Sequence, residues 1–388
     1  MRPAIVVVAY NRAFSLSRLL SSIARAKYPS NDIPLIISID NHPTNQDVIS
    51  LAEAFRWEYG EKRVATHSQR LGLRPHVLEC GDYSKEFGCV IILEDDLAVA
   101  EDFYYYAVAA QNYYQDNDHI AGVALYRQEW NDFAGNVFRP ILTEYSVFFR
   151  QSCESWGQSW TEKQWKGFRN WLENNPVLIP NDKLPKEVYG WPETSWGKYF
   201  CAYVVENGLY FVFPYIARST CFSEVGQHTG TKTLENQVCL MTGVQKNFIF
   251  PEIDQGVHYD IFFENMDLQD HIKQWTNGEP CRINLYGKHS EGDERFVLTT
   301  KWMPYRVIHS FALELRPPEY NVIRNVEGEG IFLYDLKQPV RCKNKDNELY
   351  IMDQYDLSGF ANKPVILYLA KNLIKKVIRN RLRRLLKF

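Results

Sequence analysis

The chain has 388 residues, 45% of them hydrophobic and 23% charged, an ordinary composition for a globular protein with a large core and two or more domains. Its formal net charge of −3 hides an uneven distribution, because residues 363–388 hold nine Lys or Arg and no acid. Taking these nine from the 44 basic residues leaves 35, against 47 Asp and Glu. This acidic body argues against general nucleic-acid binding, which needs a basic face.

Neither a secretory leader nor a membrane-spanning helix is expected. The strand-like run Ile5–Tyr10 follows too soon for a charged-then-apolar leader. No run of about 18 apolar residues is long enough to cross a bilayer. The eight cysteines are scattered without CxxC spacing, which favours reduced, buried thiols in a cytoplasmic protein.

Strands and helices are expected to alternate along the first hundred residues. β-branched runs predict strands at Ala4–Tyr10, Leu35–Asp40, Val64–His67 and Cys89–Leu93. Helical patterns lie between them at Leu16–Ala26, Val48–Trp57 and Arg70–Glu86. This alternation predicts a mainly parallel sheet flanked by helices, in which ligands bind beyond the carboxyl ends of the strands.

Three adjacent acids, Glu94, Asp95 and Asp96, stand at such a strand end. Carboxylates this close repel one another where they are poorly solvated. A Mg²⁺ or Mn²⁺ ion would relieve the repulsion, because these hard cations take carboxylate, phosphate and water oxygens, and it would neutralise a diphosphate leaving group. The alternative is that the acids favour the start of the next element, as expected of Glu101 and Asp102 before the aromatic helix Phe103–Tyr114.

Three motifs together resemble the GT-A glycosyltransferases. They are AYNR at Ala9–Arg12, SID at Ser38–Asp40 and LEDDLAVAEDF at Leu93–Phe103. The chain is most similar to the inverting N-acetylglucosaminyltransferases that begin complex N-glycans and to bacterial family-2-like enzymes. The likeness is good over about residues 3–125 and patchy to about 235. It implies an α/β, Rossmann-like GT-A fold and a nucleotide-sugar donor.

The resemblance also implies roles for residues at the nucleotide base. Arg12 matches an arginine that lies against the base, Asp40 an aspartate that reads the uracil edge, and His76, in GLRPH, a base-contacting histidine. Each has a simpler alternative. Arg12 could pair with a surface acid, Asp40 could cap the turn at Asn41–Pro43, and His76 could be merely packed or solvated.

In the acidic triplet, the resemblance implies that Glu94 supports the nucleotide, Asp95 meets the ribose and Asp96 ligates the metal. The late segment STCFSEVGQHTGT, with small and polar residues around His228, suits a loop that closes over a diphosphate. His228 is therefore a candidate metal or phosphate contact, with an ordinary loop histidine as the alternative.

An inverting transfer needs a general base, usually a carboxylate. In the relatives this acid lies in a tryptophan-flanked segment, which matches GWPETSW at Gly190–Trp196, but the expected aspartate is not clearly present and Gly197 comes next. Glu193 is the candidate base, with Glu224 and Asp182 as alternatives. Inverting and retaining chemistry therefore both stay open.

Tryptophans are concentrated in one stretch, since six of the ten fall between Trp156 and Trp196. Packing explains most of them. One or two could instead present a flat face to an acceptor sugar.

The C-terminal part changes character. Short alternating runs at Phe311–Leu315 and Ile331–Tyr334, broken by Pro and Gly, predict a small β-rich module. The expected divisions are a nucleotide-sugar half at 1–120, an acceptor half at 121–277, the β-rich module at 278–362 and a basic amphipathic helix at 363–388. Such a helix is typical of membrane surfaces, with a helix packed on the acidic body or a dimer contact as the alternative.

The sequence thus predicts a metal-dependent glycosyltransferase using Mn²⁺ or Mg²⁺ and a nucleotide sugar, more readily UDP- than GDP-linked. The expected acceptor is a growing surface polysaccharide, such as a capsule or O-antigen, or a lipid-linked oligosaccharide at the inner face of the membrane. Alternatives are a retaining GT-A transferase and a catalytically inactive sugar- or nucleotide-binding protein. A nucleotidyltransferase would carry a Gly-rich phosphate loop after the first strand, and AYNRAFS is not one.

Overall fold

This computed structural model describes residues 1–222, 234, 236–290, 292–341 and the isolated positions 367, 370, 371, 374 and 375. The chain forms two units, and the larger one begins with four parallel strands. The strands are β1 (Ala4–Ala9), β2 (Leu35–Ile39), β3 (Lys62–Thr66) and β4 (Cys89–Glu94). The helices between them are α1 (Ala13–Arg25), α2 (Gln46–Ala54), α3 (Leu73–Asp82) and α4 (Ser84–Phe87). The single helix expected at Arg70–Glu86 is therefore two helices, interrupted at Tyr83.

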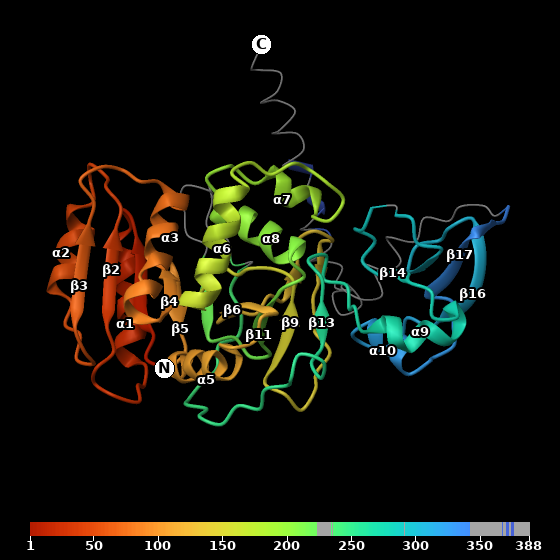
Figure 1. Ribbon diagram of the computed structural model, residues 1–388, viewed down its shortest axis with the longest axis horizontal. Helices are drawn as coiled ribbons and strands as arrows, with labels where there is room; N and C mark the ends of the chain where they lie inside the picture. Colours follow the sequence, from red (N-terminus) through yellow and green to blue (C-terminus); the bar gives the residue numbers. More distant parts are fainter. Residues whose placement is uncertain are drawn as a thin grey trace, which may run out of the picture. The chain divides into compact units, whose positions relative to one another are not determined.

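The sheet of this unit has nine strands in the order β13-β9-β11-β6-β10-β4-β1-β2-β3 (Figure 1). The added strands are β6 (Ile120–Ala124), β9 (Val147–Arg150), β10 (Gln158–Thr161), β11 (Tyr210–Pro214) and β13 (His258–Tyr259). Pairing is parallel except where β10 meets β4 and β6 and where β11 meets β9. The predicted mainly parallel α/β fold is confirmed, and one sheet continues through both halves expected on either side of residue 120.

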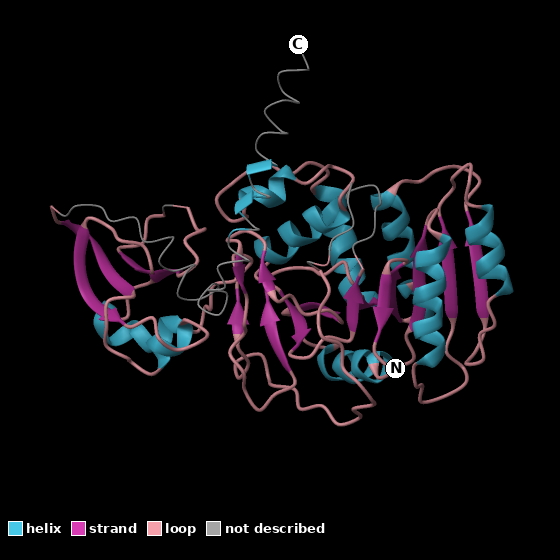
Figure 2. Cartoon of the chain, turned by 180° about the vertical axis from the view of Figure 1, so that it is seen from behind, coloured by secondary structure: helices cyan, strands magenta, loops and turns pink. Residues whose placement is uncertain are grey.

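Helices cover both faces of this sheet, as the two opposite views show (Figures 1 and 2). On one face, α1, α2 and α5 (Phe103–Tyr114) bury their apolar side chains in the core against alternate residues of the strands, among them Ile5, Val7 and Ala9. Such alternation follows from the two-residue period of a strand. The remaining helices of the unit are α6 (Glu162–Asn174), α7 (Lys186–Gly190), α8 (Trp196–Glu206) and α9 (Leu268–Thr276).

Packing accounts for much of the tryptophan-rich stretch. Trp160 and Trp165 are buried with their ring centroids 4.6 Å apart, and both stack on Phe200 of α8. The Trp165 ring lies so close to Gly81 of α3 that an added Cβ would come within 2.1 Å of it. A glycine is therefore required where α3 crosses this ring.

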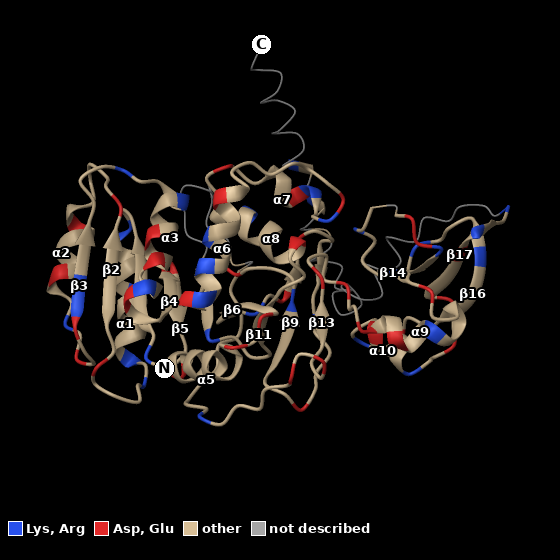
Figure 3. Cartoon of the chain, viewed as in Figure 1, with Lys and Arg blue, Asp and Glu red and all other residues tan. Residues whose placement is uncertain are grey.

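Two small pairings complete the unit. Strand β5 (Leu97–Val99), directly after the acidic triplet, pairs with β12 (Ser219–Cys221), and β7 (Trp130–Asn131) pairs with β8 (Asn136–Val137). Asp102 precedes α5 but makes no capping bond; its buried carboxylate pairs with Arg218 at 3.3 Å. Acidic and basic residues are interspersed along the ribbon of this unit (Figure 3).

The second unit is Glu279–Gly287 together with Glu294–Phe388, while Lys288–Asp293 belongs to the first unit with Met1–Gly278. Its four-stranded sheet has the order β14-β15-β17-β16, and the short helix α10 (Glu319–Ile323) precedes the last strand. The strands are β14 (Cys281–Asn284), β15 (Phe296–Thr299), β16 (Tyr305–Phe311) and β17 (Ile331–Pro339). The predicted β-rich module is confirmed, but the strand expected at Phe311–Leu315 lies earlier and ends at Phe311.

The basic tail lies outside the described residues, apart from five isolated helical positions that are exposed. Within the described part of the chain, no helix is both long and apolar enough to cross a membrane. Six of the described cysteines are buried and Cys239 is exposed, all as free thiols.

Candidate functional site

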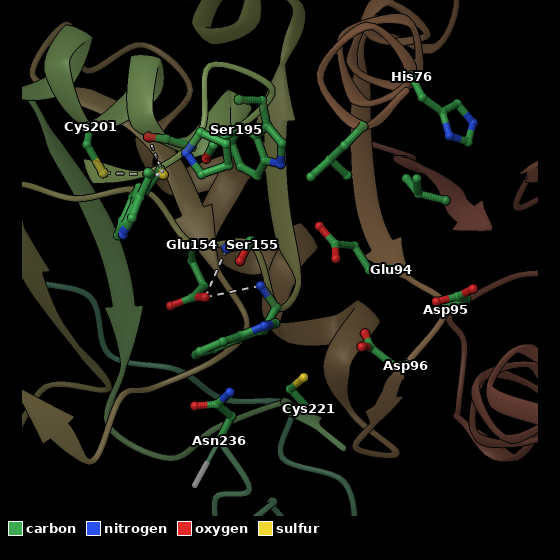
Figure 4. A pocket seen from close by; sticks show the side chains of 18 of the residues that line it. His76, Glu94, Asp95, Asp96, Glu154, Ser155, Ser195, Cys201, Cys221 and Asn236 are labelled. Atoms are coloured by element: carbon green, nitrogen blue, oxygen red, sulfur yellow. Dashed lines mark hydrogen bonds between the residues drawn. The ribbon is translucent and has the colours of Figure 1, made fainter. Parts of the chain in front are cut away.

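A pocket of about 510 Å³ lies beyond the carboxyl ends of β1, β2 and β4 (Figure 4). Six of the seven residues predicted for the nucleotide and metal line it: Arg12, Asp40, His76, Glu94, Asp95 and Asp96. The seventh, His228, falls outside the described residues. Parallel strands bring residues far apart in sequence to one edge of the sheet, which explains this convergence.

Arg12 binds the acidic triplet directly. Its Nη1 lies 3.0 Å from Asp96 Oδ2, and its Nη2 contacts Asp95 Oδ1. Burial opposes the charge on the guanidinium, but the two carboxylates outweigh it and raise the pKa of Arg12. Arg12 was expected against the nucleotide base, with an ion pair to a surface acid as the alternative. In the structure it forms ion pairs, but with two acids that line the pocket.

Asp95 and Asp96 are buried at the end of β4, and Glu94 is half-buried. Burial, together with Asp96 and Asp95, raises the pKa of Glu94 to about 8. Burial also raises the pKa of Asp95 to about 6, although the charge of Arg12 opposes the rise. The charges of Glu94 and Asp95 are therefore poorly compensated, as the adjacent acids in the sequence indicated.

The acids fit a hard divalent cation. Asp95 Oδ2 and Asp96 Oδ1 are buried and have no hydrogen-bond partner among the described residues. No group of three or more His, Cys, Asp or Glu in that part of the chain could hold an ion by itself. A protein usually contributes one or two carboxylates to a Mg²⁺ site, and substrate phosphates and water supply the remaining ligands.

Asp40 is held by the backbone around it. Its Oδ1 accepts hydrogen bonds from Asn41 N at 2.8 Å and Leu71 N at 2.7 Å, and its Oδ2 accepts one from Gly72 N at 2.9 Å. Burial opposes ionisation, but these bonds outweigh it and lower the pKa of Asp40. Gly72 has φ +83°, which favours glycine, so Asp40 anchors the tight turn that starts α3.

His76, one turn into α3, is packed and not solvated. Its side chain is buried, and its Nε2 lies 2.8 Å from Ser38 Oγ. Burial lowers the pKa of His76 to about 4, so the imidazole is neutral at pH 7. A neutral ring beside Asp40 can donate or accept one hydrogen bond, as contact with a base requires.

None of the carboxylates predicted as the general base is placed in the pocket lining by the described part of the chain. Glu193 does not line the pocket, although Trp191, Pro192 and Trp196 around it do. Its carboxylate accepts hydrogen bonds from Lys198 Nζ and Tyr199 Oη, and its side chain is 65% exposed. Asp182 is exposed and also lies away from the pocket lining, whereas Glu224 and His228 fall outside the described residues.

The sequence pattern did not single out Glu154, which lies on the wall opposite the triplet (Figure 4). It follows β9 and is only 2% exposed. The only local signal was an acid close to a cysteine and a tryptophan in CESW, at Cys153–Trp156. Trp156, Trp191 and Trp196 also line the pocket, so these three tryptophans could face a sugar.

No protein-family model matches the chain. In sequence it is similar to an Alpha-1,3-mannosyl-glycoprotein 2-beta-N-acetylglucosaminyltransferase of Arabidopsis thaliana, with 27% identity over 250 residues, or 58% of this chain and 48% of that protein. The chain thus spans about half the length of this curated relative.

S. aureus TarS 1-349 in complex with UDP matches with TM-score 0.38 and 13% identity, over 56% of this chain and 60% of that chain. GalNAc-T7 with UDP, GalNAc and Mn²⁺ matches with TM-score 0.40 and 12% identity, over 60% and 45%. Because these TM-scores lie below 0.5, the fold assignment rests on the strand order and the helical layers. The chain thus combines a mainly parallel α/β sheet, an acidic triplet at the end of β4 and sequence similarity to an N-acetylglucosaminyltransferase.

Proposed function

We propose that the chain is a metal-dependent glycosyltransferase that moves a sugar from a UDP-linked donor to a hydroxyl of a glycan acceptor. The convergence of Asp40, His76 and the acidic triplet in one pocket carries this proposal. Asp40 and His76 offer polar groups at the end where a base would lie, and Asp95 and Asp96 offer oxygens at the other.

A Mn²⁺ or Mg²⁺ ion would be held by Asp96, with donor phosphates and water completing its shell. When bound, it supplies positive charge that stabilises the departing diphosphate. The chain's own Arg12 already places a cation against the same acids. It would orient Asp95 and Asp96 before the donor arrives.

The class of donor sugar follows from the sequence relative, whose name describes an N-acetylglucosaminyltransferase. UDP-N-acetylhexosamines are therefore the first donors to test. For the acceptor we propose a surface polysaccharide or a lipid-linked oligosaccharide, because the basic, apolar pattern of residues 363–388 suits an anionic membrane. The enzyme would then act as a peripheral protein on the cytoplasmic side.

Calorimetric titration of UDP, GDP and CMP, with and without Mn²⁺, tests the nucleotide and metal site. We expect UDP to bind best, to need the metal, and to lose at least about tenfold in affinity in Asp96→Ala, or about 1.4 kcal/mol. The matched control is Asp116→Ala at an exposed acid away from the pocket lining, which should bind UDP as the unaltered chain does. Equal or absent binding of all three nucleotides would refute the proposed function.

A second experiment separates the alternatives. The anomeric configuration of the transferred sugar, read by NMR of the product, distinguishes an inverting from a retaining enzyme. Tight UDP binding without any turnover would instead identify an inactive nucleotide-binding protein.

A further inference from the structure

Glu154 combines deep burial with an unsatisfied oxygen. Its Oε1 accepts hydrogen bonds from the backbone N–H groups of Ser155, at 2.9 Å, and Trp156, at 3.1 Å (Figure 4). Its Oε2 is buried and has no hydrogen-bond partner among the described residues. Because two donors hold one oxygen, the carboxylate has a set orientation and presents the other oxygen for a further bond.

A structural ion pair does not explain this burial. Arg150, the nearest cation acting on Glu154, donates to Gln128 Oε1 and stacks on the Phe263 ring with its guanidinium carbon 3.4 Å from the centroid. No hydrogen bond joins it to Glu154 among the described contacts. Burying a carboxylate without a bonded counter-ion costs stability, and such groups are concentrated at functional sites.

The position of Glu154 suits chemistry on an acceptor. It lines the same pocket as the triplet but from the loop after β9, on the wall that also carries Trp156 and Trp196. Cys153, next to it, donates its thiol to Gly197 O at 3.5 Å, so this loop is tied to the start of α8. The carboxylate therefore lies beside the tryptophan-flanked segment, in which Glu193 itself faces away.

We propose that Glu154, and not Glu193, is the general base of the transfer, an inference that rests on the proposed function. Its Oε2 accepts the proton of the acceptor hydroxyl as that oxygen forms a bond to the anomeric carbon. The bond from the anomeric carbon to the diphosphate oxygen breaks in the same step, and its electron pair leaves with UDP. The product is inverted at the anomeric carbon.

The charges around Glu154 support this role. Burial raises its pKa to about 7, although the N–H groups of Trp156 and Ser155 and the charge of Arg150 oppose the rise. Asp132 adds to it, and Glu94, Tyr126 and Cys153 are the other ionisable groups that interact with this carboxylate. A base with a pKa near the working pH transfers protons most effectively.

The test uses Glu154→Gln in the full chain, with UDP-N-acetylglucosamine and Mn²⁺ and with water as the acceptor, so that no glycan has to be identified. We expect kcat to fall at least about 100-fold, the usual contribution of a positioned base. Affinity for UDP, measured by calorimetry, should stay unchanged. The rise of the unaltered protein's activity through about pH 7 should disappear in the variant.

Two further variants make the result specific. Glu206→Gln, a matched change at an exposed residue of α8 away from the pocket, should retain full activity. Glu193→Gln tests the rival assignment, so a larger loss there than in Glu154→Gln would overturn the proposal. If Glu154→Gln does not fold, Glu154→Ala with added formate takes its place, and a failure of formate to restore turnover to folded Glu154→Ala would also overturn it.

Failure of the proposed function gives a different result. Absent UDP binding by the unaltered chain would refute the nucleotide site itself. UDP binding without hydrolysis of the donor would overturn the base assignment together with the transferase activity. Hydrolysis that survives in Glu154→Gln would overturn the base assignment alone.

Discussion

At the scale of single residues, Asp40 shows how one side chain can both build and equip a site. It directly follows β2, and three backbone N–H groups, those of Asn41, Leu71 and Gly72, converge on its carboxylate. Hydrogen bonds to a charged acceptor are among the stronger ones in proteins. Asp40 therefore fixes the turn from which α3 brings His76 to the pocket.

Asp40→Asn should lower the free energy of unfolding by about 2 to 4 kcal/mol at pH 7, because the amide places an NH₂ group against backbone N–H donors. Urea denaturation measures this. The folded chain lowers the pKa of Asp40, so its contribution is present above the unfolded pKa and is lost as pH falls. The difference from the unaltered chain should therefore narrow towards pH 3, and a constant difference would contradict the assignment.

At the scale of elements, the short helix α10 begins with an acid, Glu319, whose environment is unusual. Glu319 is fully buried, and neither of its carboxylate oxygens has a hydrogen-bond partner among the described residues. An acid normally favours the first turn of a helix. Here desolvation dominates and raises the pKa of Glu319 to about 8.

Glu319→Gln should therefore become more stabilising, relative to the unaltered chain, as pH rises from 6 to 8. A raised folded pKa contributes stability below the unfolded pKa that is lost as pH rises through the folded one, whereas Gln does not titrate. At about 1.4 kcal/mol per pKa unit, the gain over this range is about 2 kcal/mol. Thermal unfolding at a series of pH values measures it, with exposed Glu314→Gln as the control. If the stability of Glu319→Gln and that of the unaltered chain change in parallel with pH, burial does not hold Glu319 protonated and the prediction is wrong.

At the scale of the whole molecule, every residue that lines the pocket belongs to the larger unit, whereas the basic pattern follows the β-rich module in the sequence. Removing the tail should therefore leave UDP binding intact. The tail is proposed to act on where the enzyme works and not on its chemistry.

The full chain should co-sediment with vesicles that contain phosphatidylglycerol and not with phosphatidylcholine alone, because each Lys or Arg near an anionic surface contributes about 1 kcal/mol. High salt should release it, since salt screens charges. A chain ending at Asn362 should stay in solution and bind UDP as before. If the tail instead packs on the acidic body, the full chain would not co-sediment with vesicles. The shortened chain would then unfold at a lower temperature than the full chain.

Sequence by itself determined the four parallel strands β1 to β4, the helices α1 and α2 between them, and the place of Arg12, Asp40 and the acidic triplet at the strand ends. It did not indicate the break between α3 and α4 or the short strand β5. These features depend on local periodicity, and the parallel alternation dictates which ends meet. The resemblance could extend this only as far as its motifs, so the base stayed open among Glu193, Glu224 and Asp182.

Only the tertiary structure decided what meets across the pocket. The pairing of Arg12 with Asp95 and Asp96 spans more than eighty positions, and the antiparallel insertion of β10 beside β4 carries the preceding loop, with Glu154, to the far wall. The local sequence pattern cannot predict contacts between residues so far apart in the sequence, because the packing of the whole sheet and its helices determines them. Burial, which turns Glu154 from an ordinary acid into a candidate base, is likewise a property of the folded chain alone.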